Sequence, residues 1–142
     1  MGRRPVVVVD TNVLLLAARR GFPFRAEVDR LLPGARLVVP SCVLRELDML
    51  VARRTAGSVV ARELAGRLEV EATARSGDAG VVDVAVRSRG IVATADRALQ
   101  RLLTGRGIGV LIPRDRARLE LRPPSVREPL RSAPRSLRSK AA

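Results

Sequence analysis

Val6-Val7-Val8-Val9-Asp10-Thr11-Asn12 is the stretch that decides the fold of this chain. Four consecutive β-branched apolar residues predict a strand that is buried on both faces, as in the middle of a parallel sheet. In an open α/β sheet the ligand lies just beyond the carboxyl ends of such strands. Asp10 therefore stands where an α/β protein does its chemistry, although the N-cap of the next helix explains this residue about as well.

Strand-like runs recur along the chain, and amphipathic helical patterns fill the intervals between them. The predicted strands are 6–9, 37–39, 68–70, 91–94 and 110–112, and the predicted helices are 11–20, 25–32, 41–51, 57–66, 78–90 and 96–105. Strands that alternate with helices predict an α/β fold in which helices cover both faces of a parallel sheet.

The length and a change in composition define the domain organisation. A chain of 142 residues can form one domain with its own core. Residues 122–142 differ from the rest, since they contain four prolines, four serines and a series of arginines. Such a segment buries too little surface to offset the entropy of ordering it. We therefore expect a folded domain over 1–121 and a basic, disordered tail over 122–142.

The composition also excludes several kinds of chemistry. The chain has no His and a single Cys, so it has no His-based triad, no His-ligated zinc and no internal disulfide. Its formal net charge of +13 favours a polyanionic partner, of which nucleic acid is the usual one and an anionic membrane surface the alternative. No apolar run is long enough for a membrane span and no signal peptide is visible, so we expect a cytoplasmic protein.

Three further acids follow predicted strands. Glu46 lies in the helix after the second strand, Asp78 at the start of a later helix, and Asp96 directly after the fourth strand. Each has a simple structural explanation, because Asp78 and Asp96 can cap helices and Glu46 can belong to a solvated helix face. Glu46 nevertheless lies among Val43, Leu47 and Leu50, near the margin of the buried face, where an acid needs a partner.

The four acids together indicate more than any one of them alone. In a right-handed βα array, Asp10, Glu46, Asp78 and Asp96 converge on one edge of the sheet. Four neighbouring carboxylates repel one another and are pushed towards protonation, which divalent cations relieve. An all-oxygen site suits Mg²⁺ or Mn²⁺, and such sites catalyse phosphoryl transfer.

These motifs resemble those of the PIN-domain ribonucleases over residues 5 to 120. The matching segments are Val-Val-Val-Asp10-Thr11-Asn12, the stretch from Val39 to Leu47, the helix that runs from Asp78 to Ala85, and the stretch from Ile91 to Leu99. The segment 106–110 further resembles the closing strand in archaeal relatives of the PIN nuclease that processes small-subunit rRNA.

The resemblance implies a three-layer α/β/α fold whose five-stranded parallel sheet has the order 3-2-1-4-5. It also implies that the four acids bind Mg²⁺ or Mn²⁺ and are catalytic, and that Asn12 and Thr94 hold Asp10 and Asp96 by side-chain hydrogen bonds. RNA is the implied partner, in a homodimer, and the arginines that we expect to contact its phosphates are Arg53, Arg97 and Arg101. Ala79 replaces the second of two adjacent acids that close relatives carry, which would weaken a second metal site.

The sequence thus favours a metal-dependent endoribonuclease that processes rRNA. A toxin that cuts tRNA, rRNA or mRNA and is paired with an antitoxin protein is an alternative, and so is an RNA-binding ribosome-assembly factor that does not cut. Other phosphotransfer enzymes fit poorly. Phosphatases of the haloacid-dehalogenase type need a second Asp where this chain has Asn12, and receiver domains need a Lys near the last strand, whereas Lys140 is the only Lys.

Overall fold

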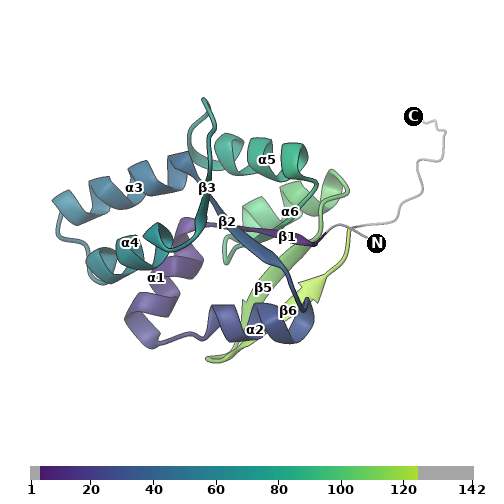
Figure 1. The fold of residues 1–142 in the computed structure, drawn as a ribbon, viewed down its shortest axis with the longest axis horizontal. Coiled ribbons are helices and arrows are strands. Elements are labelled where there is room, and N and C mark those ends of the chain that lie inside the picture. The colour runs from purple at the N-terminus through teal and green to yellow at the C-terminus, as the bar shows by residue number, and fades with distance from the viewer. Residues whose placement is uncertain (1–3, 125–142) are drawn as a thin grey trace.

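The computed structural model of the chain describes residues 4–124 and contains one six-stranded sheet flanked by helices (Figure 1). The strands are β1 (Val6–Val9), β2 (Arg36–Pro40), β3 (Glu69–Glu71), β4 (Ile91–Ala93), β5 (Val110–Arg114) and β6 (Arg118–Arg122). The helices are α1 (Thr11–Arg20), α2 (Phe24–Leu31), α3 (Ser41–Ala52), α4 (Ser58–Gly66), α5 (Gly77–Ser88) and α6 (Arg97–Gly105).

The strand order β3-β2-β1-β4-β5-β6 contains the expected parallel order 3-2-1-4-5. The register aligns Val8 of β1 with Val38 of β2 and with Val92 of β4. The expectation of five strands was one short, because β6 pairs antiparallel with β5 at the edge of the sheet. Since β1 and β4 are neighbours that lead to helices on opposite faces, the strand order reverses beside the end of β1, where such folds bind ligands.

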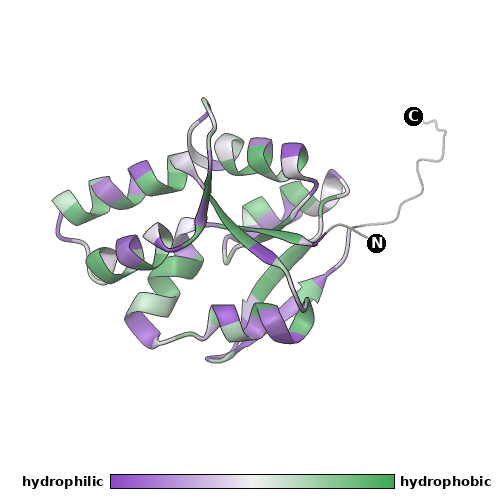
Figure 2. Ribbon diagram, viewed as in Figure 1, coloured by the Kyte–Doolittle hydropathy of each residue, from purple (hydrophilic) through white to green (hydrophobic). Residues whose placement is uncertain are grey.

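The core lies on both faces of the central strand. Val7, Val8 and Val9 have no exposed surface, which explains why β1 reads as a continuous apolar run. Right-handed crossovers place α1 to α4 on one face and α5 and α6 on the other. Figure 2 shows that β1, β2 and β5 are largely hydrophobic, while the helices carry polar residues on their outer turns.

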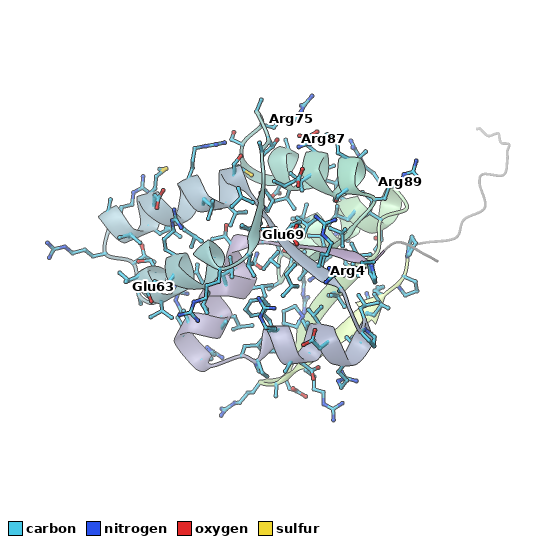
Figure 3. All side chains as sticks on the ribbon, in the orientation of Figure 1. Arg4, Glu63, Glu69, Arg75, Arg87 and Arg89 are labelled. Carbon is cyan, nitrogen blue, oxygen red and sulfur yellow. The ribbon has the colours of Figure 1, made fainter. Side chains whose placement is uncertain are left out.

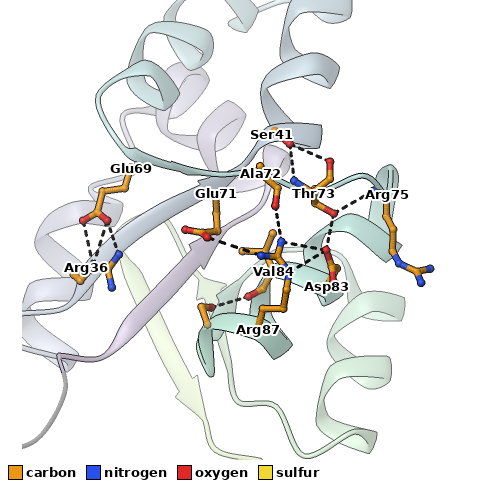
Figure 4. A network of polar contacts seen from close by, with 11 residues as sticks. Arg36, Ser41, Glu69, Glu71, Ala72, Thr73, Arg75, Asp83, Val84 and Arg87 are labelled. Atoms are coloured by element: carbon orange, nitrogen blue, oxygen red, sulfur yellow. Dashed lines mark hydrogen bonds and ion pairs between the residues drawn. The ribbon is translucent and has the colours of Figure 1, made fainter.

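Helices α3 and α5 approach each other closely at the carboxyl edge of the sheet. A side chain at Gly80 of α5 would lie 2.5 Å from the Cys42 Sγ atom of α3, so only glycine fits there. The Ser41 hydroxyl group accepts a 3.0 Å hydrogen bond from the Thr73 N–H group, which fastens the loop before α5 to the start of α3 (Figure 4). These contacts determine where the first turn of α5 lies.

Strand β6 extends the folded domain one residue beyond the boundary that we predicted at residue 121. It extends through Arg122, the first residue of the predicted tail, and residues 125–142 of that tail lie outside the described part of the chain. The Glu27 carboxylate of α2 accepts a 2.8 Å hydrogen bond from the Leu119 N–H group, and Arg30 pairs with the same carboxylate. These bonds lower the pKa of Glu27 to about 2 and tie β6 to α2. Within residues 4–124, no helix has the length and apolarity needed to cross a bilayer.

Candidate functional site

A pocket of about 520 Å³ lies at the carboxyl edge of the sheet, and all four predicted acids line it. Asp10 follows β1, Asp96 follows β4, Asp78 lies in the first turn of α5, and Glu46 lies in the second turn of α3. Because these segments converge where the strand order reverses, acids that are far apart in sequence become neighbours. We call this hollow the acid pocket.

Both carboxylate oxygens of Asp10 accept hydrogen bonds that hold the side chain in place. Its Oδ1 atom accepts a 2.8 Å bond from the Thr11 N–H group, and its Oδ2 atom accepts a 2.7 Å bond from the Thr94 hydroxyl group. The Asn12 amide group donates a further 3.2 Å bond to Oδ2. The side chain is 7% exposed. Asp10 therefore caps α1, and hydrogen bonds also hold it in one orientation at the pocket wall.

Asn12 and Thr94 connect Asp10 to the segment around Asp96. The Asn12 Oδ1 atom accepts a 2.8 Å bond from the Ala95 N–H group, and the Thr94 hydroxyl oxygen accepts a 3.1 Å bond from the Asp96 N–H group. Both side chains thus bond the carboxylate of Asp10. Towards Asp96, Thr94 contacts the backbone rather than the carboxylate.

Asp96 and Asp78 are held less tightly than Asp10. The Asp96 Oδ1 atom accepts a 3.1 Å bond from the Leu99 N–H group, so this residue caps α6 as well as lining the pocket. Asp78 is exposed and, among the described residues, has no side-chain hydrogen bond. For Asp10 and Asp96, capping and pocket lining are therefore compatible roles, whereas Asp78 lies in the first turn of α5 without capping it.

Glu46 is positioned by a residue that the sequence did not single out. The buried Thr11 hydroxyl group donates a 2.7 Å hydrogen bond to the Glu46 Oε1 atom, while the glutamate side chain itself is exposed at the rim. Only the packing of α1 against α3 brings these residues together, so no local pattern could have revealed the contact.

The electrostatics of the pocket favour a cation. Burial raises the pKa of Asp10, and the charges of Asp78 and Glu46 raise it further against the lowering effect of its hydrogen bonds. Burial also raises the pKa of Asp78, with Asp96 and Glu46 adding to the rise. The carboxylates therefore repel one another across the pocket.

The acids of the pocket differ from most other acids of this arginine-rich chain. Six acids elsewhere form ion pairs with arginine, namely Glu27, Asp48, Glu69, Glu71, Asp83 and Glu120. Within residues 4–124, none of the four pocket acids forms such a pair. Leaving four neighbouring carboxylates unneutralised is costly in itself, which points to an external cation.

The donor set fits a hard divalent ion. All four ligand candidates are carboxylates, the groups that Mg²⁺ and Mn²⁺ prefer. No group of three or more His, Cys, Asp or Glu side chains in the described chain is already arranged to hold a metal ion. Asp10 is fixed and Thr11 holds one oxygen of Glu46, whereas Asp78 is exposed and has no side-chain hydrogen bond among the described residues, so its side chain is free to rotate towards a cation.

The predicted phosphate-binding arginines do not line the pocket. Arg53 ends α3 about two turns beyond Glu46, and Arg97 and Arg101 lie on the exposed face of α6. Their roles stay predictions. Arg45, which the sequence did not single out, is the basic residue among the described ones that lines the acid pocket.

Ala79 lines a neighbouring groove between α5 and α6 and not the acid pocket. A second acid at this position would thus project from the first turn of α5 towards that groove. In this fold the alanine changes the surface beside the pocket and leaves the four pocket acids in place.

Comparisons with known proteins agree with this geometry. A family model described as "PIN like domain" matches residues 7–116. Among solved structures, the PIN domain endonuclease Utp24 superposes with a TM-score of 0.69 at 22% identity, over 88% of this chain and 98% of that one. A domain of a functionally unknown protein from Methanocaldococcus jannaschii gives a TM-score of 0.59 at 20% identity, over 78% of this chain and 91% of that one.

VapBC2 from Rickettsia felis, crystallised with a DNA fragment from its promoter, gives a TM-score of 0.55 at 16% identity, over 68% of this chain and 92% of that one. At these identities the likeness concerns the fold alone. No curated protein matches the chain.

Proposed function

The chain belongs to the PIN-like domain family and has its nuclease fold, and from this premise we propose that it is a metal-dependent endoribonuclease. Asp10, Glu46, Asp78 and Asp96 are its catalytic, metal-binding residues, and Mg²⁺ or Mn²⁺ is its cofactor. The observation that carries the proposal is the acid pocket, where four carboxylates meet without an arginine partner among the described residues.

Each acid has a role that its surroundings suggest. Asp10 and Asp96 would hold the principal metal, because hydrogen bonds to Thr94, Thr11 and Leu99 restrict their motion. Asp78 and Glu46 would complete the site or orient the attacking water, since both are exposed at the rim. A bound divalent cation supplies charge neutralisation at the scissile phosphate and lowers the pKa of a bound water molecule.

The residues around the acids prepare them for this role. Thr94 and Asn12 aim Asp10 into the pocket, and Thr11 fixes one oxygen of Glu46 so that the other stays available to a water molecule. The pocket is also lined by Leu15, Val43 and Val81, which restrict water on its inner side. Low local polarity strengthens the attraction between the carboxylates and a cation.

RNA is the proposed substrate, and rRNA or its precursor the proposed target. The net charge of +13 favours a polyanion, and Arg53, Arg97 and Arg101 are exposed. The resemblance of the segment 106–110 to rRNA-processing relatives supports the specific target. The structural likeness to VapBC2 supports the toxin alternative, in which an antitoxin protein would be a further partner.

The test is cleavage of single-stranded RNA in the presence of Mn²⁺. We expect the wild-type chain to cut RNA internally, Asp10→Asn to lose at least about 10³-fold in rate, and Glu63→Gln to retain full activity. Glu63 is a matched control because it is an exposed acid on α4 (Figure 3) that does not line the acid pocket. Equal cleavage by wild type and Asp10→Asn would refute the assignment, and RNA binding without cleavage would favour the assembly-factor alternative.

A further inference from the structure

A second hollow of about 490 Å³, which we call the α5–α6 groove, lies beside the acid pocket. Arg75, Ala79, Val82, Val86, Leu102 and Arg106 line it, together with Asp83. The residues come from the loop before α5 and from the facing sides of the two helices. The mechanism proposed above uses none of them.

The floor of the groove is apolar although it faces solvent. Val86 is 55% exposed and Leu102 is 44% exposed, and both belong to this one hollow. Single exposed apolar residues are ordinary on protein surfaces, and Val59 on α4 is one example. Two exposed apolar side chains that share a hollow with the apolar Val82 and Ala79 instead indicate a surface that is covered in use.

The groove and the acid pocket are lined by neighbouring residues of the chain. Ser76, Gly77 and Asp78 line the pocket, whereas Arg75 and Ala79, their immediate neighbours, line the groove. From Ala79 to Val86 the groove follows α5 for about 10 Å away from the catalytic edge. An RNA strand that crosses the first turn of α5 from the pocket would therefore reach the groove.

The charge of the groove favours an anionic occupant. No ion pair of Arg75 or Arg106 is formed within residues 4–124, so both guanidinium groups are available to a ligand. Asp83 is already engaged, because its Oδ2 atom accepts bonds from Arg87 at 3.2 Å and from the Thr73 hydroxyl group at 2.8 Å (Figure 4). Figure 3 shows Arg75 on the loop that leads into α5.

We propose that the α5–α6 groove binds the single-stranded RNA segment adjoining the cleavage point. Bases would pack on Val82, Val86 and Leu102, while Arg75 and Arg106 would contact backbone phosphates. An apolar floor with flanking cations is the combination that binds single strands without reading sequence. This inference rests on the proposed function, because the place of the groove beside the acid pocket selects RNA over an acidic protein segment as the occupant.

The experiment compares affinities of the full-length chain for single-stranded RNAs of about 4 and about 16 nucleotides, in EDTA, by fluorescence anisotropy. The test variants are Val86→Asp and the double variant Arg75→Ala/Arg106→Ala. Their controls are Val59→Asp, at an exposed valine of α4, and Arg116→Ala, at the exposed turn between β5 and β6. Circular dichroism of each variant verifies the fold before binding is measured.

We expect both groove variants to bind the longer RNA about tenfold more weakly than their controls. The double variant should also lower the slope of log affinity against log salt by about 1.4, the value for two phosphate contacts on a single strand. Unchanged affinity of the groove variants for the longer RNA would overturn the proposal and favour a protein occupant. The binding measurement is made without metal and so does not depend on cleavage. If the wild-type chain cuts no RNA but the groove variants still bind RNA more weakly than their controls, the RNA-binding groove is upheld and only the proposed nuclease activity is rejected.

Discussion

Thr94 has a buried hydroxyl group that both donates to Asp10 and accepts from the Asp96 N–H group. Thr94→Val keeps the shape of the side chain but removes both of these bonds and a third, 3.3 Å bond that the hydroxyl oxygen accepts from the Asn12 amide group. We expect it to lower the free energy of unfolding by about 1–3 kcal/mol, since it leaves buried polar groups unpaired, and to weaken Mn²⁺ binding about 10–100-fold. Urea denaturation and Mn²⁺ titration measure the two effects.

The control for this prediction is Thr104→Val, which removes a hydroxyl group that bonds only to backbone carbonyls within α6. We expect its effect on stability to be small and its Mn²⁺ affinity to be that of the wild type. A Thr94→Val variant that binds Mn²⁺ as tightly as this control would show that Thr94 does not position Asp10.

Asp78 gives a prediction about pH. Its pKa in the folded protein is raised above 3.8, so the folded state holds this proton more tightly than the unfolded state does. The ionised carboxylate therefore lowers stability at neutral pH, and this penalty vanishes as the pH falls through the folded-state pKa towards 3.8. Without metal, Asp78→Asn should raise the melting temperature at pH 7, and the gain should shrink towards acidic pH.

Thermal unfolding in EDTA across this pH range measures the effect as the difference between wild type and variant. The difference reports the effect of Asp78 together with its effect on Asp10, because the charge of Asp78 is one cause of the raised pKa of Asp10 and both effects act in the same direction. A wild type that is the more stable of the two at pH 7 would show that repulsion within the pocket is not the dominant interaction of Asp78.

At the scale of elements, the contact between α3 and α5 sets the distance between Glu46 and Asp78. A methyl group at position 80 would lie 2.5 Å from the Cys42 Sγ atom and 2.9 Å from the Arg75 carbonyl oxygen. We expect Gly80→Ala to lower the free energy of unfolding by about 1–3 kcal/mol, despite the better helix propensity of alanine. Adding Cys42→Ala should restore part of the loss. Urea denaturation measures both.

Gly66→Ala is the matched control, since the nearest atom to a methyl group there is the Arg62 Nη1 atom at 3.6 Å. This substitution should be neutral or stabilising by up to about 1 kcal/mol. If Gly80→Ala behaves like Gly66→Ala, the two helices can separate at no cost and their approach does not define the acid pocket.

The sequence predicted the elements whose signals are local. The valines of β1 and the apolar stripes of α1 and α3 reflect burial directly, so their positions were predicted to within a few residues. Strand β6 was missed because its five residues, Arg118 to Arg122, alternate apolar with charged side chains beside a basic tail. Its pairing with β5 and its bond to Glu27 of α2 connect residues that are far apart in the sequence.

The same division applies to the candidate site. Asp10, Asp78 and Asp96 could be predicted to line one pocket because each follows a strand or begins a helix at the same edge of the sheet. Three features could not be predicted, because they depend on how the helices are rotated against each other. They are the Thr11–Glu46 hydrogen bond, the position of Arg45 in the acid pocket and the position of Ala79 in the α5–α6 groove. Side-chain neighbours across helices follow from packing and not from spacing along the chain.

At the scale of the whole molecule, charge is distributed unevenly. The chain has 27 basic and 14 acidic residues, yet its four pocket acids face one another without an arginine partner among the described residues. Under the proposed function the surrounding positive charge would attract RNA and the pocket a divalent cation, so the two ligands would be drawn to adjacent surfaces. Binding of the cation is therefore the premise of every catalytic role proposed above.

Calorimetric titration of Mn²⁺ into the metal-free chain at neutral pH tests that premise most directly, with Asp10→Asn and Glu63→Gln titrated beside the wild type. The wild type and Glu63→Gln should bind Mn²⁺ with the same affinity, and Asp10→Asn should bind it at least about tenfold more weakly. A wild-type chain that binds no Mn²⁺, or an Asp10→Asn variant that binds it as tightly as the wild type, would contradict the assignment of the acid pocket as the metal site.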